Sequence, residues 1–178
     1  MKIRTAHCGD LQAVEEIYNQ IHTEEKAGRT TTCWIRDVYP TIHTAEGALD
    51  RGDLFVMEDD GGELVGAAII NQQQVDVYAN GSWQHDAPPE EVMVLHTLVI
   101  SPAQANKGLG KIFVHFYEQY AIEKGCRFLR MDTNVKNTRA RAVYAKLGYR
   151  EAGVVPCVFN GIQGVELVLL EKCLLHSC

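Results

Sequence analysis

Hydrophobic residues recur along this chain with two different periods, and segments of the two kinds alternate. Short apolar runs predict strands at residues 2–6, 54–58, 64–70, 92–100, 128–131, 152–159 and 165–170. Between them, apolar residues spaced three and four apart predict helices that begin near residues 11, 44, 108 and 138. Strands that alternate with helices predict an α/β fold. Because the 178 residues contain no repeat and no linker, we expect one domain over residues 1–178.

Polar residues and glycines mark the expected ends of these helices. Asp10 and Thr44 are predicted N-caps of the first two helices, and Asn137 or Thr138 is the predicted N-cap of the last. Gly125 follows the third helix at the position where a left-handed residue ends many helices. Two polar, irregular segments, residues 24–44 and 72–90, lie outside the periodic pattern.

The most apolar strand leads directly into the stretch with the clearest chemistry. Residues 92–100 (VMVLHTLVI) are nearly all apolar, which predicts a strand buried on both faces in the middle of the sheet. A polar turn follows, and a helix starts at Gly108. Gly108 and Gly110 lie in its first turn, where unpaired N–H groups and small side chains suit a phosphate. We therefore expect a pyrophosphate site there.

Spacing excludes two common phosphate loops at this place. The dinucleotide fingerprint requires a third glycine where this chain has Phe113. The Walker loop requires glycine at Ala105 and Ser or Thr at Ile112. A general nucleotide-binding α/β domain is accordingly the least favoured class.

Composition and charge narrow the other classes. The formal net charge is −6 and no basic run occurs, so we expect no nucleic-acid partner. No apolar run is long enough to span a membrane, and the N-terminal residues lack the apolar core of a signal peptide, so we expect a cytoplasmic protein. Six cysteines are scattered without metal-ligand spacing, so we expect no metal site: Cys8, Cys33, Cys126, Cys157, Cys173 and Cys178. Several of them lie within apolar runs, which favours buried thiols.

Two motifs give the chain a family resemblance. The segments LVISP and ANKGLG, followed later by NTRARAVYAKLGY, resemble the paired motifs of the GNAT superfamily of N-acetyltransferases. The resemblance extends over nearly the whole chain. It implies a mixed, mostly antiparallel sheet flanked by helices, with two central strands that splay around acetyl-CoA. One departure is Ala105, where the family usually has Arg or Gln, so a side-chain contact to the pyrophosphate is missing.

The resemblance also implies which residues bind acetyl-CoA. The Leu98 amide would meet the acetyl oxygen, Ile100 would pair with the pantetheine amides, and the loop and helix start would hold the pyrophosphate. Lys107, Lys111, Arg139 and Arg141 are further candidates for phosphate contacts through their charge. The predicted cofactor residues are Leu98, Val99, Ile100, Asn106, Lys107, Gly108, Leu109, Gly110, Lys111 and Asn137.

Two residues are predicted to be catalytic. Tyr144 matches the tyrosine that, in the family, protonates the departing CoA thiolate; packing in the core is its other interpretation. Alternation places His96 on the same strand face as Leu98, where it could take a proton from the incoming amine. A hydrogen-bonded core histidine is equally compatible, and Glu90 and Glu91 are rival bases. A covalent route through Cys33 or Cys126 is disfavoured.

The leading hypothesis is an acetyl-CoA-dependent N-acetyltransferase that acts on a primary amine of a small molecule or on a peptide amino terminus, by direct attack in a ternary complex. The alternative is a non-catalytic sensor that binds CoA. A homodimer is left open. The acceptor pocket is expected from residues 24–44 and 72–90, with Trp34, Tyr39, Tyr78 and Trp83 as candidate lining residues.

Overall fold

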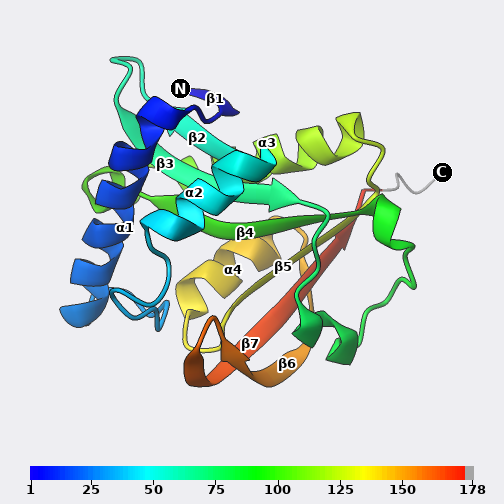
Figure 1. Cartoon of the computed structure of the whole chain (residues 1–178). Coiled ribbons are helices and arrows are strands. Elements are labelled where there is room, and N and C mark those ends of the chain that lie inside the picture. The colour runs from blue at the N-terminus through cyan, green and yellow to red at the C-terminus, as the bar shows by residue number, and fades with distance from the viewer. Residues whose placement is uncertain (175–178) are drawn as a thin grey trace.

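The computed structural model describes residues 1–174, so Cys178 lies outside the described residues. One seven-stranded sheet forms the centre of the protein, in the order β1-β2-β3-β4-β5-β7-β6 (Figure 1). The strands are β1 (Lys2–Thr5), β2 (Leu54–Glu58), β3 (Leu64–Asn71), β4 (Val92–Ile100), β5 (Phe128–Asn134), β6 (Arg150–Phe159) and β7 (Ile162–Cys173). The predicted strands are all present.

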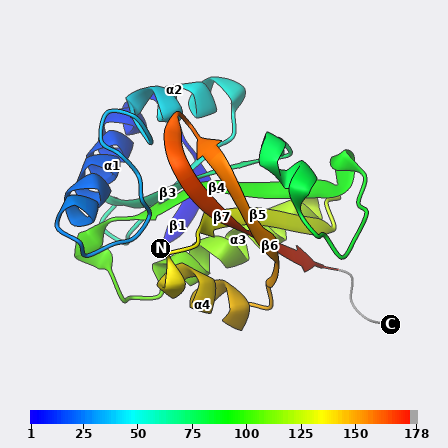
Figure 2. The same cartoon turned by 90° about the horizontal axis from the view of Figure 1, so that it is seen from below.

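Helices cover both faces of the sheet. They are α1 (Leu11–Lys26), α2 (Ile42–Arg51), α3 (Leu109–Glu123) and α4 (Thr138–Lys146). Figure 2 shows α1 and α2 on one face and α3 and α4 on the other. Buried residues of α1 and α2 pack with Leu54, Val56 and Ala67, whereas α3 packs with Phe55, Met57 and Met93. Successive residues of β2 thus contribute to opposite cores, as strand alternation requires.

β4 is the central strand, as its apolar sequence predicts. It pairs with β3 in antiparallel orientation and with β5 in parallel orientation. The other paired neighbours in the described sheet are antiparallel. The expected fold class, a mixed and mostly antiparallel sheet flanked by helices, is therefore confirmed.

The β4–β5 pairing stops halfway along both strands. It joins Val92–Leu95 to Phe128–Met131 and goes no further. Beyond Leu95, β4 keeps its pairing with β3, and beyond Met131, β5 keeps its pairing with β7. The two central strands diverge from this point (Figure 1). This divergence is the splay that the family resemblance implied.

A β-bulge in β4 changes which side chains share a face. Ala67 pairs with Val99 and Ile69 pairs with His96, so β4 uses one residue more than β3 over this interval. Thr97 has a φ of 49°, a left-handed conformation typical of such an insertion. Leu95 and Leu98 consequently both face the α3 side. The expectation that His96 shares a face with Leu98 is wrong, because the extra residue shifts the alternation by one.

One helix end differs from the sequence prediction, and two others agree with it. The second helix is capped by Thr41, and Thr44 lies at its third position, where its hydroxyl accepts a hydrogen bond from the Thr41 amide at 3.0 Å. Both residues form a reciprocal capping box. Asn137 caps α4 through the Ala140 amide, and Gly125 follows α3 in a left-handed conformation, as predicted.

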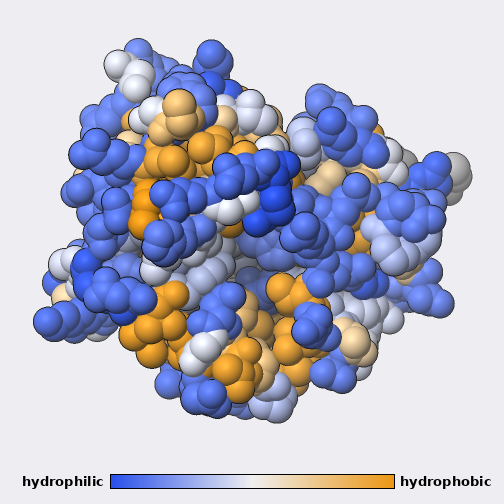
Figure 3. Space-filling view, in the orientation of Figure 1, coloured by the Kyte–Doolittle hydropathy of each residue, from blue (hydrophilic) through white to orange (hydrophobic). Residues whose placement is uncertain are grey.

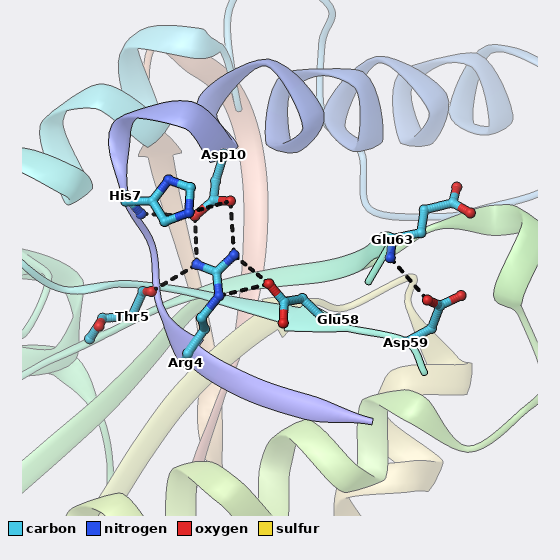
Figure 4. A network of polar contacts seen from close by, with 7 residues as sticks. All are labelled: Arg4, Thr5, His7, Asp10, Glu58, Asp59 and Glu63. Carbon is cyan, nitrogen blue, oxygen red and sulfur yellow. Dashed lines mark hydrogen bonds and ion pairs between the residues drawn. The ribbon is translucent and has the colours of Figure 1, made fainter. Parts of the chain in front are cut away.

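The first strand is fixed to the fold by one arginine (Figure 4). Arg4 of β1 donates hydrogen bonds to both carboxylate oxygens of Asp10, at 2.7 and 3.0 Å, and to Glu58 of β2 at 2.8 Å. Asp10 is only 5% exposed. Burial by itself raises the pKa of Asp10, but the bonds from Arg4 and the His7 amide outweigh it, so the pKa lies below its ordinary value.

The far edge of the sheet is more exposed. β6 is the last strand, and its Val154 and Val158 are about half exposed. Figure 3 shows hydrophilic residues over most of one face of the molecule, with hydrophobic residues gathered in two regions, one around the β6–β7 end and one over the α1–α2 end.

We expect Arg4→Met to lower the free energy of unfolding by about 2 kcal/mol at pH 7, because it leaves the Asp10 carboxylate buried without its cation. The loss should begin to shrink as the pH falls below about 4, where the carboxylate becomes protonated in the unfolded chain, and should disappear once the pH is below the lower pKa of folded Asp10. Urea unfolding at several pH values measures both effects. Arg29→Met, which removes an exposed ion pair with Glu24, should change stability little; an equal loss in both variants would contradict the prediction.

Candidate functional site

Two cavities open where β4 and β5 diverge. The larger has a volume of about 590 Å³ and extends along the start of α3 and α4. The smaller, about 90 Å³, lies between the unpaired halves of β4 and β5. Leu98 and Asn137 line both of them. The cavities therefore meet at the middle of the sheet, beside the β4 backbone that has no partner strand.

Most of the predicted cofactor residues line the larger cavity. Those that do are Leu98, Ile100, Asn106, Gly108, Leu109, Gly110, Lys111 and Asn137. Val99 packs its side chain into the α1–α2 core and lines neither cavity, so only its backbone is available to a ligand. Lys107 is exposed and donates to Gln104 at 2.6 Å, outside the cavity lining.

The start of α3 offers free amides to the larger cavity. Gly108 is the N-cap with a φ of 78°, and no side chain caps the helix. A Cβ added at Gly110 would meet no atom within 4 Å, so the cavity has open space beside it. The amides of the first helical turn lack intrahelical acceptors and carry the positive end of the helix dipole. An anionic group can approach this backbone closely.

The Lys and Arg side chains near the larger cavity differ in whether they could contact an anionic ligand. Arg139 and Lys111 line it, and Arg139 donates a hydrogen bond to Asn106 across the loop. Arg141 does not line it, because its guanidinium is paired with Glu151 at 2.7 and 2.9 Å. Ala105 also lines the cavity, with a methyl group in place of a polar side chain. Arg29 lines the cavity as well, but its guanidinium is paired with Glu24 at 2.7 Å.

Tyr144 lies on α4 and lines the larger cavity near its junction with the smaller one. Its ring packs edge-on against Tyr149, with 6.0 Å between the centroids, and belongs to the periphery of the α3 core. Burial, together with the negative charge of Asp132, raises the pKa of Tyr144 to about 12. The hydroxyl is therefore protonated at neutral pH and can donate a hydrogen bond.

The smaller cavity is aromatic, with one carboxylate. Trp34, Tyr39 and Phe159 line it, together with Asp132 of β5. Tyr78 donates a hydrogen bond to Asp132 Oδ2 at 2.8 Å, and Tyr39 is hydrogen-bonded to Thr97 at the β4 bulge. Of the two irregular segments, residues 24–44 line this cavity, whereas residues 72–90 reach it only through the Tyr78 hydrogen bond. Of the four aromatic candidates, Trp34 and Tyr39 line it, and Tyr78 and Trp83 instead line an outer pocket, where Arg130 stacks on Trp83 at 4.1 Å.

His96 is among the residues that line the smaller cavity, but it pairs with Ile69 of the α1–α2 core and so faces the side of the sheet opposite Leu98. Its Nε2 lies 3.1 Å from both the Gln73 carbonyl and Asn71 Oδ1. Because a carbonyl oxygen only accepts, Nε2 carries the proton. Burial lowers the pKa of His96 to about 4, with partial opposition from the Gln73 contact and the charge of Asp53. The imidazole is neutral at pH 7 and is a weak base.

The rival bases lie at the wrong end of β4. Glu90 and Glu91 belong to a 3₁₀ turn, Pro89–Glu91, that precedes Val92, and neither lines the two cavities. Cys33 lines the smaller cavity, and Cys126 is buried near Glu90. Burial raises the pKa of both thiols, which favours the unreactive protonated form.

Asp132 is the residue that sequence reasoning missed. The predicted strand ended at Met131, whereas β5 continues to Asn134 through a polar segment, DTN. A polar end on an otherwise apolar strand, shortly before the α4 motif, is the signal that could have identified it. Its direction into the cavity depends on where the β4–β5 pairing stops, which local pattern does not encode.

Residues 1–174 contain no group of three or more His, Cys, Asp or Glu side chains placed to hold a metal ion. Within the same residues, every helix is too short or too polar to cross a membrane.

A family model described as the acetyltransferase (GNAT) family matches residues 11–149. Among curated proteins, the chain is similar to an Escherichia coli streptothricin acetyltransferase, 26% identical over 56% of each chain. It is also similar to an aminoglycoside N(6′)-acetyltransferase type 1 from Salmonella typhimurium, 27% identical over 42% of this chain and 54% of the relative. The chain therefore spans little more than half the length of these relatives.

Solved structures match over the whole described fold. An acetyltransferase of the GNAT family from Listeria monocytogenes superposes with a TM-score of 0.73 at 22% identity, covering 97% of this chain and 94% of the other. An acetyltransferase from Salmonella typhimurium, solved with its cofactor acetyl-CoA, has a TM-score of 0.70 at 19% identity, covering 100% and 96%. At these identities the likeness establishes the fold.

We expect His96 to titrate with a midpoint of about 4, as its environment indicates. Because this folded pKa lies below the unfolded value of about 6.5, the imidazole stabilises the fold above that pH, and the stabilisation is lost as the pH falls towards 4. Two-dimensional NMR of the histidine ring nitrogens, assigned with His96→Gln, measures the midpoint and the tautomer. A midpoint near 6.5, or a proton on Nδ1 at pH 7, would contradict this environment.

Proposed function

Because the chain belongs to the acetyltransferase (GNAT) family, we propose that it transfers the acetyl group of acetyl-CoA to a primary amine by direct attack in a ternary complex. The observation that carries this proposal is the meeting of two cavities at Leu98. One is long and ends at a helix N-terminus, which suits a CoA pyrophosphate. The other is small and suits an acceptor group. Both substrates can then be bound at once.

The unpaired half of β4 would position the thioester. The Leu98 and Ile100 backbone has no strand partner on the β5 side, so its polar groups are available to the amides of pantetheine. An amide aimed at the acetyl oxygen would stabilise the charge that develops there. An amine that arrives as an ammonium ion first gives one proton to solvent. The neutral nitrogen then forms a bond to the carbonyl carbon, the C–S bond breaks, and a second proton leaves the nitrogen as CoA leaves as the thiol.

Tyr144 would act on the departing sulfur. Its pKa of about 12 lies well above the ~8.5 of a thiol, so complete proton transfer to the thiolate is uphill by roughly 5 kcal/mol. A hydrogen bond from the hydroxyl to the developing thiolate avoids that cost and still lowers the barrier. We therefore assign Tyr144 as the hydrogen-bond donor to sulfur, with solvent able to supply the final proton.

Release of free thiol from acetyl-CoA, measured across a panel of small amines and peptides, tests the function directly. Thiol should appear in equal amount with acetylated amine. Gly110→Leu should raise the KM for acetyl-CoA at least tenfold, about 1.4 kcal/mol, because its side chain fills the space beside the helix amides. Gln119→Leu, on the exposed side of α3, is the matched control. Binding of acetyl-CoA without any turnover would favour the sensor alternative instead.

Tyr144→Phe should lower kcat about 10–100-fold and leave acetyl-CoA affinity nearly unchanged, because only a hydrogen bond in the transition state is lost. Steady-state kinetics with calorimetric titration of acetyl-CoA separates the two effects. Full turnover in the Phe variant would assign Tyr144 to packing alone.

A further inference from the structure

The smaller cavity has a charge pattern that restricts what can enter it. Asp132 is its one carboxylate, and no Lys or Arg belongs to its lining. His96 contributes no positive charge, because its imidazole is neutral at pH 7. Outside the lining, Lys136 and Glu25 act on the Cys33 thiol with opposite signs. This lining therefore favours a positively charged group inside the cavity, and it contains no positively charged side chain that could pair with an acid group.

The Asp132 carboxylate is held in place but has no cation of its own. Tyr78 Oη donates to one oxygen at 2.8 Å, which fixes the orientation of the side chain. No ion pair within residues 1–174 involves it, in contrast to Asp10, Asp53 and Glu171. Burial raises the pKa of Asp132 to about 6, against the opposing effect of Tyr78, so the carboxylate is mostly charged above pH 7. A charged carboxylate that is only partly exposed and has no ion pair is costly unless a cation joins it.

Aromatic side chains complete the surroundings of this carboxylate. Trp34 and Tyr39 meet edge to face with 5.8 Å between ring centroids, and Tyr39 and Phe159 do so at 5.3 Å. Their faces carry partial negative charge, so a desolvated ammonium near them gains further stabilisation. The hydrogen bond from Tyr39 to Thr97 ties this aromatic group to the β4 bulge.

From this arrangement we infer that the acceptor is a compact amine that enters as an ammonium ion, held by Asp132 and the aromatic group, and that bears no acid group near the amine. This inference rests on the proposed function. The volume of about 90 Å³ encloses only the amine-bearing end of an acceptor. Asp132 is a binding residue for the acceptor, and it lies on the side of Leu98 where the amine must arrive.

Two acceptors of nearly equal shape test the inference in the wild-type protein. β-Alaninamide and β-alanine differ by an amide in place of a carboxylate, three atoms from the amine. We expect kcat/KM for β-alaninamide to be at least 100-fold higher in the thiol-release assay. Equal rates, or a preference for β-alanine, would overturn the inference and leave the proposed function standing. Absence of thiol release with every amine would overturn the function, and calorimetric binding of the two compounds to the CoA-loaded protein would still test the inference.

Asp132→Asn removes the charge and keeps an oxygen that can accept the Tyr78 hydrogen bond. We expect kcat/KM for β-alaninamide to fall at least 30-fold, the preference over β-alanine to shrink to within tenfold, and the KM for acetyl-CoA to stay unchanged. If Asp132 had only a structural role, the substitution would lower kcat/KM for both acceptors by the same factor and leave the ratio of the two values unchanged. Asp50→Asn, at an exposed position of α2, is the matched control. An unaltered preference in the Asp132→Asn variant would overturn the inference.

Discussion

The arrangement of this protein depends on backbone hydrogen bonds that two central strands do not make. Buried N–H and C=O groups must find partners, and a parallel pair such as β4 and β5 normally satisfies them along its whole length. Here the pairing ends at Leu95 and Met131, and each strand continues with only its outer neighbour. The cavities between the diverging halves exist because of this break, and a ligand with amides of its own can complete the ladder.

A single inserted residue determines which side chains face that opening. The left-handed Thr97 lets Leu98 and Ile100 face the α3 side together with Met93 and Leu95, although the spacing changes from even to odd. The same insertion turns His96 towards Asn71 and Gln73. The imidazole donates a hydrogen bond from Nε2 and so helps to hold this part of the fold together. Its lowered pKa makes it a poor proton acceptor. The two carboxylates at the start of β4 are too distant to replace it, which leaves Asp132 as the charged group beside the opening.

Sequence reasoning succeeded where local pattern and neighbouring motifs carry the information. Periodicity and capping chemistry predict three features that the structure confirms: the central position of β4, the start of α3 at Gly108 and the Asn137 cap of α4. It failed at Thr97, because a bulge depends on pairing with β3 and leaves no mark in the residue types. It also failed to select Asp132, because the role of a polar residue at a strand end depends on where a distant strand stops pairing. From the sequence, Arg141 and Arg139 have equal standing as candidates for phosphate contacts, but Arg141 is paired with Glu151 in the fold.

The two cavities share Leu98 and Asn137 but draw the rest of their walls from different parts of the chain. The larger is built mainly from the ends of α1 and β4 and the starts of α3 and α4. The smaller takes its aromatic wall from the loop after α1 and the end of β6, with apolar residues from the first half of β7. Mutations in that loop and at the turn of the β6–β7 hairpin can therefore change the smaller cavity while the walls of the larger stay intact. Under the proposed function, one inherited way of binding the acyl donor can then serve many acceptors, each acquired by changes in these outer segments.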